Sequence, residues 1–230
     1  QDEENLAGIV LLATKKKGKS YGYDDLNFLE SVSSIASIAV RNSRLYEKAC
    51  IEARTDELTG LLNRKYFYEL LNQQYEKKPN RELALIIINI DDFKLYNQLY
   101  GMKEGDAALQ NAAKIISATV GERGYVARYS GKEFAAALPD FDVLAARNIA
   151  ESIRMQILNM NKRATDYALK VLTVSCGICT IPYSASNIKQ LVENADMAVF
   201  SVKRKGKNGV MVFDIGSHID GSTRDGEPLV

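Results

Sequence analysis

Acidic and basic side chains stand at the ends of two predicted strands, where carboxylates could hold a metal ion. Asp91 follows the apolar run Leu83–Ile90 and lies two residues beyond Asn89, so period-2 alternation places both on one strand face. Lys132 and Glu133 follow a Ser-Gly turn signal further along the chain. Carboxylates hold divalent cations and an ammonium repels them, so this set combines possible metal ligands with a competing positive charge.

Alternating strands and helices are predicted around these residues. Leu83–Ile90 is typical of a buried strand, and residues 125–138 predict two short strands around Ser130 and Gly131, a hairpin signal. The expected order over residues 83–181 is βαββαβ, which indicates an α+β, ferredoxin-like fold with an antiparallel sheet backed by helices. The remaining predictions are helices at 64–77, 105–119, 141–160 and 187–204, and strands at 169–181 and 210–213.

The first fifty residues predict a strand, a turn and one long helix. The strand is expected over 6–13, the turn over 15–22, and the helix from near Asp24, with Asp24 or Asp25 as its cap, toward Ala53. One heptad frame aligns Leu29, Ala36, Ser43 and Cys50 with Val32, Ala39, Tyr46 and Ala53. Most of these are apolar, which predicts a modest coiled-coil seam and a homodimer through this helix. The alternative is a single helix packed on its own domain.

Composition excludes several classes of function. Thirty basic and 29 acidic residues nearly cancel, which gives no global attraction to nucleic acid or anionic membranes. The longest apolar run is too short for a membrane span, which needs about 20 residues. Three cysteines give no even disulfide framework, which favours a reduced, cytoplasmic location. His218 is the only histidine, so no histidine triad is available.

Five separated segments resemble, in order, the motifs of the GGDEF family, the fold of the diguanylate cyclases. They are DELTGLLNR at 56–64; NIDDFK at 89–94 with Asn97, Gly101, Gly105 and Asp106; RYSGKEF at 128–134; TVSCGI at 173–178; and ADMAVF at 195–200 with Lys203, Gly206, Lys207 and Asn208. Each motif alone would be weak. Five in order at family spacing, over about residues 56–213, make chance resemblance improbable.

The resemblance implies a cyclase reaction but also an altered metal site. Family members join two GTP molecules, and Mg²⁺ held by carboxylates meets the phosphate charge. The two family ligand positions hold Asn89 and Lys132 here. An ammonium about 4 Å from another unit positive charge is repelled by roughly 4 kcal/mol at an effective dielectric of 20, and a divalent ion by about twice that. We therefore expect no metal site and little or no cyclase activity, with Lys132 replacing part of the Mg²⁺ charge.

Two alternatives stay open for the remaining acids. Glu133 matches the fourth signature position, a catalytic acid in the family, and Asp91 could remain as a metal ligand; Mg²⁺ is expected only if cyclase activity persists. Otherwise Asp91, Asp92 and Glu133 would simply pair with Lys132 and Lys94.

The resemblance assigns nucleotide binding to five residues. Asn97 and Asp106 match the residues that read the guanine edge, where an amide donates and accepts and a carboxylate accepts. Lys94 and Lys203 match lysines of the family. Lys207 stands where the family has a phosphate-binding arginine, so the positive charge is kept but the bidentate guanidinium is lost. The alternative is that Asn97 caps a turn and the lysines are ordinary surface charges.

The expected organisation follows from these resemblances. Residues 1–46 resemble the C-terminal part of a GAF domain, 25–55 form a signalling helix, 56–214 the GGDEF domain, and 215–230 a flexible tail. The family's product-inhibition motif RxxD has no match at residues 121–124, so we expect no feedback site of that kind.

Three functions remain at this stage. The first is a regulatory module that binds GTP or a related nucleotide without cyclase activity. The second is an active diguanylate cyclase with an unusual metal site. The third is a dimerisation scaffold that binds no nucleotide.

Overall fold

The central strand of the structure is β2 (Leu83–Ile90), whose eight residues are all buried. It pairs antiparallel with β4 (Glu133–Pro139) on one edge and with β5 (Val174–Ile181) on the other. The structure is a computed structural model that describes residues 9, 11, 13, 20–78, 81–160 and 171–214. Its chain divides into two compact units, Gln1–Ala53 and Arg54–Val230, which are described one at a time.

Six strands form one sheet in the second unit, in the order β1-β3-β4-β2-β5-β6. The hairpin partner of β4 is β3 (Tyr125–Ser130), and two short parallel strands, β1 (Leu62–Asn63) and β6 (Gly209–Val212), close the edges. The order from β2 to β5 is the predicted βαββαβ, so the α+β fold class is confirmed.

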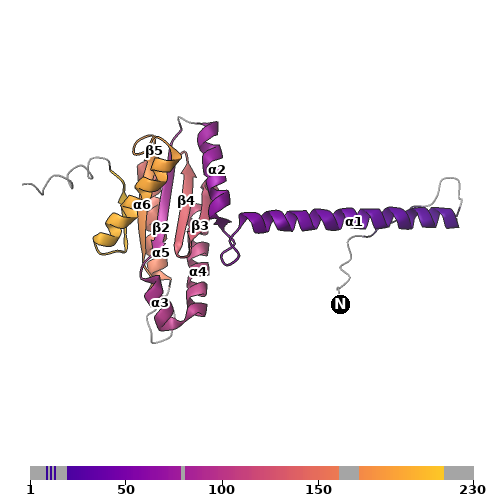
Figure 1. Ribbon diagram of the computed structural model, residues 1–230, viewed down its shortest axis with the longest axis horizontal. Helices are drawn as coiled ribbons and strands as arrows, with labels where there is room; N and C mark the ends of the chain where they lie inside the picture. Colours follow the sequence, from indigo (N-terminus) through magenta and orange to yellow (C-terminus); the bar gives the residue numbers. More distant parts are fainter. Residues whose placement is uncertain are drawn as a thin grey trace, which may run out of the picture. The chain divides into compact units, whose positions relative to one another are not determined.

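Helices cover both faces of this sheet (Figure 1). On one face lie α3 (Phe93–Tyr100), α4 (Met102–Val120) and α5 (Val143–Asn159); on the other lie α2 (Arg64–Lys77) and α6 (Ile188–Arg204). Alternate β2 residues enter the two cores, with Ile86 and Ile88 facing α4 and α5, and Leu85 and Ile87 facing α2 and α6. The continuous apolar run of β2 is therefore explained by burial on two sides.

Several predicted boundaries were wrong. The helix expected at 105–119 begins at Met102, and the separate helix α3 was not predicted. Gly101, at φ 88°, separates α3 from α4 and donates its N–H to the Asn97 carbonyl at 2.9 Å. The strand expected at 169–181 begins at Val174, and the strand expected at 210–213 is one residue earlier.

Helix α1 (Tyr23–Arg54) has 32 residues and no buried side chain, and all but its last residue belong to the first unit. It begins slightly before the predicted start, so Asp24 and Asp25 lie in its first turn rather than at the cap. There their charges favour the positive end of the helix dipole. The strand and turn predicted over 6–22 lie largely outside the described residues, and the tail at 215–230 lies wholly outside them. Among the described residues, no helix is long and apolar enough to span a membrane.

Gly177 explains how α6 packs directly on β5. A Cβ atom added there would lie 2.2 Å from the Ala195 carbonyl oxygen and 2.5 Å from the Val199 nitrogen. These are backbone atoms of α6, which cannot move without shifting the helix. The glycine of the TVSCGI segment is therefore required by the close approach of helix and strand.

We predict that Gly177→Ala destabilises the second unit by about 3 kcal/mol, because overpacking against backbone forces the helix away. Urea unfolding followed by circular dichroism measures this difference. Gly131→Ala is the matched control, since nothing lies within 4 Å of its added Cβ. Equal stability of the two variants would contradict the prediction.

Candidate functional site

Two adjoining hollows lie at the carboxyl end of β2. The first, here called the α3–α4 pocket, has a volume of about 610 Å³ and is lined by Phe93, Lys94, Asn97, Gln98, Met102, Asp106, Leu109, Arg128, Gly131 and Lys132. The second, the lysine pocket, has about 420 Å³ and is lined by Ile90, Asp91, Asp92, Lys94, Leu95, Gln98, Lys132, Lys203 and Lys207. Lys94, Gln98 and Lys132 line both, so one elongated ligand could occupy the two.

The α3–α4 pocket combines apolar walls with a few polar atoms. Phe93, Met102 and Leu109 supply the apolar surface, and Asn97 and Asp106 supply polar groups. Within the described part of the chain, the Asn97 side-chain oxygen is buried and has no hydrogen-bond partner. A buried polar atom without a partner costs about 1–3 kcal/mol, so this oxygen lacks a donor that the described protein groups do not supply.

Gly105 provides the space for the Asn97 side chain. A Cβ added at Gly105 would lie 1.8 Å from the Asn97 oxygen and 2.9 Å from its Cγ. No other residue type fits there without displacing Asn97. The interpretation that Asn97 only caps a turn does not match this arrangement, because the oxygen accepts from no described group.

The lysine pocket brings four ammonium groups to one place. Lys94, Lys132, Lys203 and Lys207 all line it. Partial burial lowers the pKa of Lys203, and the neighbouring charge of Lys132 lowers it further. This positive field is what a phosphate group requires, and it opposes a metal ion at the same position.

Lys207 differs from the other three lysines because it has a bound carboxylate. Its Nζ donates to Oδ1 and Oδ2 of Asp92 at 2.7 and 2.8 Å, which raises the pKa of Lys207. Both residues have left-handed backbone, with φ of 47° for Asp92 and 65° for Lys207, and Asn208 follows at 46°. Such conformations cost of order 1 kcal/mol each outside glycine and gather at functional sites.

Asp91 is held by three hydrogen bonds and is only 6% exposed. Its oxygens accept from the Thr173 hydroxyl at 2.8 Å, the Ser175 hydroxyl at 2.7 Å and the Asn208 backbone N–H at 3.1 Å. A metal ion at Asp91 would have to replace these donors. The expected alternative in which the acids pair with Lys132 and Lys94 was wrong, since Asp92 pairs with Lys207 and Asp91 with hydroxyl groups.

Glu133 faces Asn89 across the β2–β4 pairing. The Asn89 amide donates to Oε1 of Glu133, and the Ser130 hydroxyl donates to Oε2 at 2.7 Å. Asn89 is 2% exposed, and its own side-chain oxygen has no partner among the described groups. Burial raises the pKa of nearby Asp196, and the Glu133 charge raises it further. Within the described ranges, no three histidine, cysteine or acidic side chains cluster as metal ligands would.

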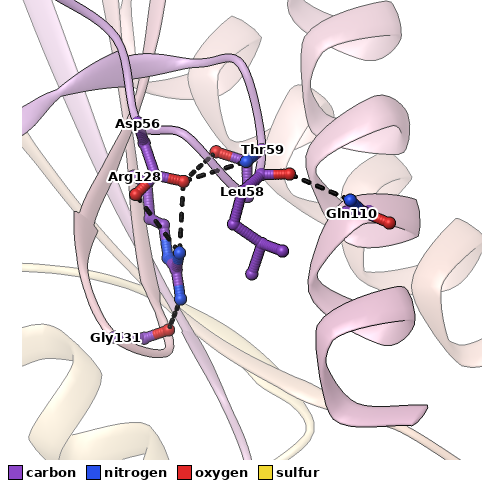
Figure 2. A network of polar contacts seen from close by, with 6 residues as sticks. All are labelled: Asp56, Leu58, Thr59, Gln110, Arg128 and Gly131. Carbon is purple, nitrogen blue, oxygen red and sulfur yellow. Dashed lines mark hydrogen bonds and ion pairs between the residues drawn. The ribbon is translucent and has the colours of Figure 1, made fainter. Parts of the chain in front are cut away.

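A polar network holds the β3–β4 turn that carries Lys132 (Figure 2). The Arg128 guanidinium donates to both Asp56 carboxylate oxygens at 3.1 and 3.2 Å and to the Gly131 carbonyl at 2.7 Å. Asp56 also accepts from the Thr59 N–H at 2.9 Å and hydroxyl at 2.7 Å. Burial would raise the Asp56 pKa, but these bonds outweigh it and hold the pKa below its usual value.

The same network reaches α4. Gln110 donates to the Leu58 carbonyl at 3.1 Å, so the turn that begins at Asp56 is fixed to the helix that carries Asp106. The segment directly after α1, the β3–β4 turn and α4 are therefore joined by side chains rather than by a shared strand. The network therefore connects Arg128 and Gly131, which line the α3–α4 pocket, to the helix that carries Asp106.

The family model described as "Diguanylate cyclase, GGDEF domain" matches residues 53–209. The chain belongs to the GGDEF family. It is similar to Diguanylate cyclase A of Treponema denticola, with 32% identity over 216 residues that cover 90% of this chain and 56% of that protein. It is also similar to the uncharacterized protein YtrP of Bacillus subtilis, with 31% identity over 93% of this chain and 35% of that protein. The chain thus spans about half or less of these relatives.

Solved GGDEF structures agree with the fold. The coiled coil and GGDEF domain of DgcB from Caulobacter crescentus, in complex with c-di-GMP, matches with a TM-score of 0.71 and 28% identity, over 80% of this chain and 98% of that chain. Diguanylate cyclase SiaD from Pseudomonas aeruginosa, in complex with its activator SiaC, matches with a TM-score of 0.65 and 26% identity, over 83% of this chain and 74% of that chain.

The structure brings the predicted site residues of this GGDEF domain to one end of the sheet. Seven of them line the two pockets: Asp91, Lys94, Asn97, Asp106, Lys132, Lys203 and Lys207. Asn89 and Glu133 lie beside them on the α6 face, bonded to each other. Sequence reasoning did not include Phe93, Gln98, Met102 and Arg128, although the α3 spacing from Lys94 to Asn97 and Gln98 would have indicated a shared helix face.

We predict that Gly105→Ala weakens GTP binding to the GGDEF domain by at least about tenfold, because the new methyl group displaces the Asn97 oxygen. Stability should stay equal or rise by up to about 1 kcal/mol, since alanine favours a helix over glycine. Calorimetric titration and urea unfolding measure the two effects. Asn97→Ala should reproduce the binding loss. Tight GTP binding by Gly105→Ala would show that the Asn97 oxygen does not contact the ligand.

Proposed function

We propose that this GGDEF domain binds a guanine nucleotide without needing Mg²⁺ and acts as a regulatory module rather than a cyclase. The observation that carries the proposal is Lys132, which stands at the family's metal-ligand position and lines both pockets. A protein ammonium at that place supplies positive charge to a phosphate directly. It also removes the carboxylate that a metal ion would need there.

The lysine pocket supports a phosphate-bearing ligand. Four ammonium groups face two carboxylates, Asp91 and Asp92, which leaves two net positive charges around the hollow. Ammonium groups bind phosphate oxygens as charge-assisted hydrogen bonds, about twice as strong as neutral ones. In a partly enclosed site this attraction is screened less than on an open surface.

The α3–α4 pocket supports a purine base next to those phosphates. The unpartnered Asn97 oxygen can accept from a base, and the Asp106 carboxylate accepts from the N1 and N2 hydrogens of guanine. Phe93, Met102 and Leu109 provide apolar surface for the rings. Adenine lacks the paired donors that a carboxylate would accept, so we propose guanine.

The donor set around Asn89 does not fit Mg²⁺. An amide replaces one family carboxylate and an ammonium replaces the other, and the remaining acid Glu133 is already bonded to Asn89 and Ser130. Mg²⁺ prefers hard, charged oxygen ligands with near-octahedral geometry. The proposal therefore contains no metal-dependent step, and no role for Glu133 as a catalytic acid.

The regulatory part of the proposal rests on the N-terminal region. We propose that α1 pairs with a second copy of the chain through the seam of Val32, Ala39 and their heptad neighbours, and that residues 1–46 are the end of a GAF-like domain. In α1, the seam residues Val32 and Tyr46 are 44% and 74% exposed, which gives such a helix side chains to bury against a second copy. A coiled coil next to a GGDEF domain is also present in DgcB.

A second candidate function is an active diguanylate cyclase, which the similarity to Diguanylate cyclase A favours. It requires Asp91 or Glu133 to leave its present partners and hold a metal ion. The third candidate, a scaffold without a ligand, leaves the unpartnered Asn97 oxygen and the grouped lysines unexplained.

We predict that GTP binds in EDTA as tightly as in Mg²⁺, and that no cyclic di-GMP forms. Calorimetric titration, with chromatography of the same samples, measures both. Lys132→Gln should weaken GTP binding about tenfold by removing one charged hydrogen bond. Lys114→Gln is the matched control, because Lys114 is an exposed α4 lysine outside both pockets. Binding that requires Mg²⁺, or product formation, would disprove the proposal.

We also predict that the double variant Asn89→Asp with Lys132→Asp gains Mg²⁺-dependent GTP binding. The two new carboxylates stand with Glu133 around one position, and their mutual repulsion is relieved by a divalent cation. Titration with GTP at increasing Mg²⁺ measures the gain. Product from the double variant alone would show that the cyclase was lost for electrostatic reasons. Unchanged metal dependence would count against the assigned ligand positions.

A further inference from the structure

The Asp92–Lys207 ion pair lies in the lysine pocket, and the proposed nucleotide binding gives it no role. Lys207 holds both Asp92 oxygens, at 2.7 and 2.8 Å. In the described part of the chain, the other three pocket lysines, Lys94, Lys132 and Lys203, have no carboxylate partner within 4.0 Å. Lys207 is thus already paired with the Asp92 carboxylate, which presents a negative charge and two oxygens as a phosphate group would.

The backbone holds this pair over the pocket from two distant segments. Asp92 stands between β2 and α3, and Lys207 stands in the turn between α6 and β6, 115 residues later. Both are in the left-handed region, at φ 47° and 65°. The Lys207 N–H donates to the Val202 carbonyl at 3.1 Å, so the lysine backbone is anchored independently of its side-chain ion pair.

The pair is exposed enough to exchange partners. The side chains of Lys207 and Asp92 are 42% and 59% exposed. Ion pairs of this kind contribute little, typically about 0.2–1 kcal/mol, because water screens them. A ligand phosphate that reaches Lys207 could therefore replace Asp92 without unfolding any element.

We infer that Asp92 is a built-in competitor for phosphate: its carboxylate occupies Lys207 in the free domain, and a nucleotide polyphosphate must displace it to bind. The inference rests on the proposed function, since it names the part of the same ligand that meets Lys207. Lys94 and Lys132 line both pockets, whereas Lys207 lines only the lysine pocket. Phosphates close to the base therefore meet Lys94 and Lys132, and the terminal phosphate meets Lys207. Asp92 accordingly lowers affinity for a triphosphate and leaves a monophosphate almost unaffected.

The decisive variant is Asp92→Asn, which removes the charge while keeping the shape, and asparagine tolerates left-handed backbone. Calorimetric titration without Mg²⁺ compares GTP, GMP and inorganic tripolyphosphate on variant and wild type. We expect GTP and tripolyphosphate to bind about two- to fivefold tighter to Asp92→Asn, and GMP to bind equally. Unchanged or weaker GTP and tripolyphosphate binding would overturn the inference.

The chain offers a matched control in Asp140. It also has left-handed backbone, at φ 64°, and an ion pair, with Arg81, but its N–H bonds to the Glu82 carbonyl at the opposite end of β2. Asp140→Asn should leave all three affinities unchanged. If it tightened GTP as much as Asp92→Asn, the effect would be one of net charge and the inference would fail.

Lys207→Gln separates competition from general repulsion. In that background Asp92 has no cation to occupy, so adding Asp92→Asn should change GTP affinity by less than about twofold. An undiminished gain would overturn the inference. Failure of the proposed function is a distinct outcome: wild type would then bind GTP only with Mg²⁺, and tripolyphosphate binding without metal would still decide the role of Asp92. If neither wild type nor Asp92→Asn binds either probe, both proposals are wrong.

Discussion

The burial of β2 on both faces and both edges is the constraint on which the rest of the molecule depends. Each backbone group along the strand pairs with β4 or β5, and alternate side chains fill two separate cores. A strand buried in this way can place polar side chains near solvent only at its end. Asn89, Asp91 and Asp92 are placed at this end, and α3 starts directly afterwards. The site is therefore a product of strand termination.

Arg128 has the corresponding role on the hairpin side. The turn that carries Gly131 and Lys132 has little packing of its own, and its geometry comes from the guanidinium bonded to Asp56 and to the Gly131 carbonyl. Planar guanidinium groups suit such two-sided contacts, which a lysine could not reproduce. The end of β2 places Asp91 and Asp92 at the lysine pocket, and this network holds the turn whose Gly131 and Lys132 line the α3–α4 pocket.

The architecture was largely predictable from the sequence, because periodicity and turn signals are local. β2, the β3–β4 hairpin, α1 and α6 follow from apolar patterns that need no partner. α3 was missed because it has eight residues, a left-handed residue at its start and no side-chain cap. A helix of this kind is stabilised by the packing of Tyr96 rather than by a local signal.

The sequence predicted which residues form the site, but not which of them are bonded to one another. Motif positions identified Asn97, Lys203 and Lys207, yet the bond between Asp92 and Lys207 joins residues 115 positions apart and depends on two unusual backbone conformations. Likewise, the donation from Asn89 to Glu133 follows from strand register, which the sequence alone does not fix.

The grouping of lysines in one pocket has a consequence for the conditions under which the domain responds. Cations that belong to the chain are present at constant stoichiometry, whereas a bound metal ion varies with its free concentration. Their attraction for an anion is screened by dissolved salt, over a Debye length of about 8 Å at physiological ionic strength. A domain that binds an anionic ligand through this pocket would therefore bind it more weakly as the ionic strength of its surroundings rises.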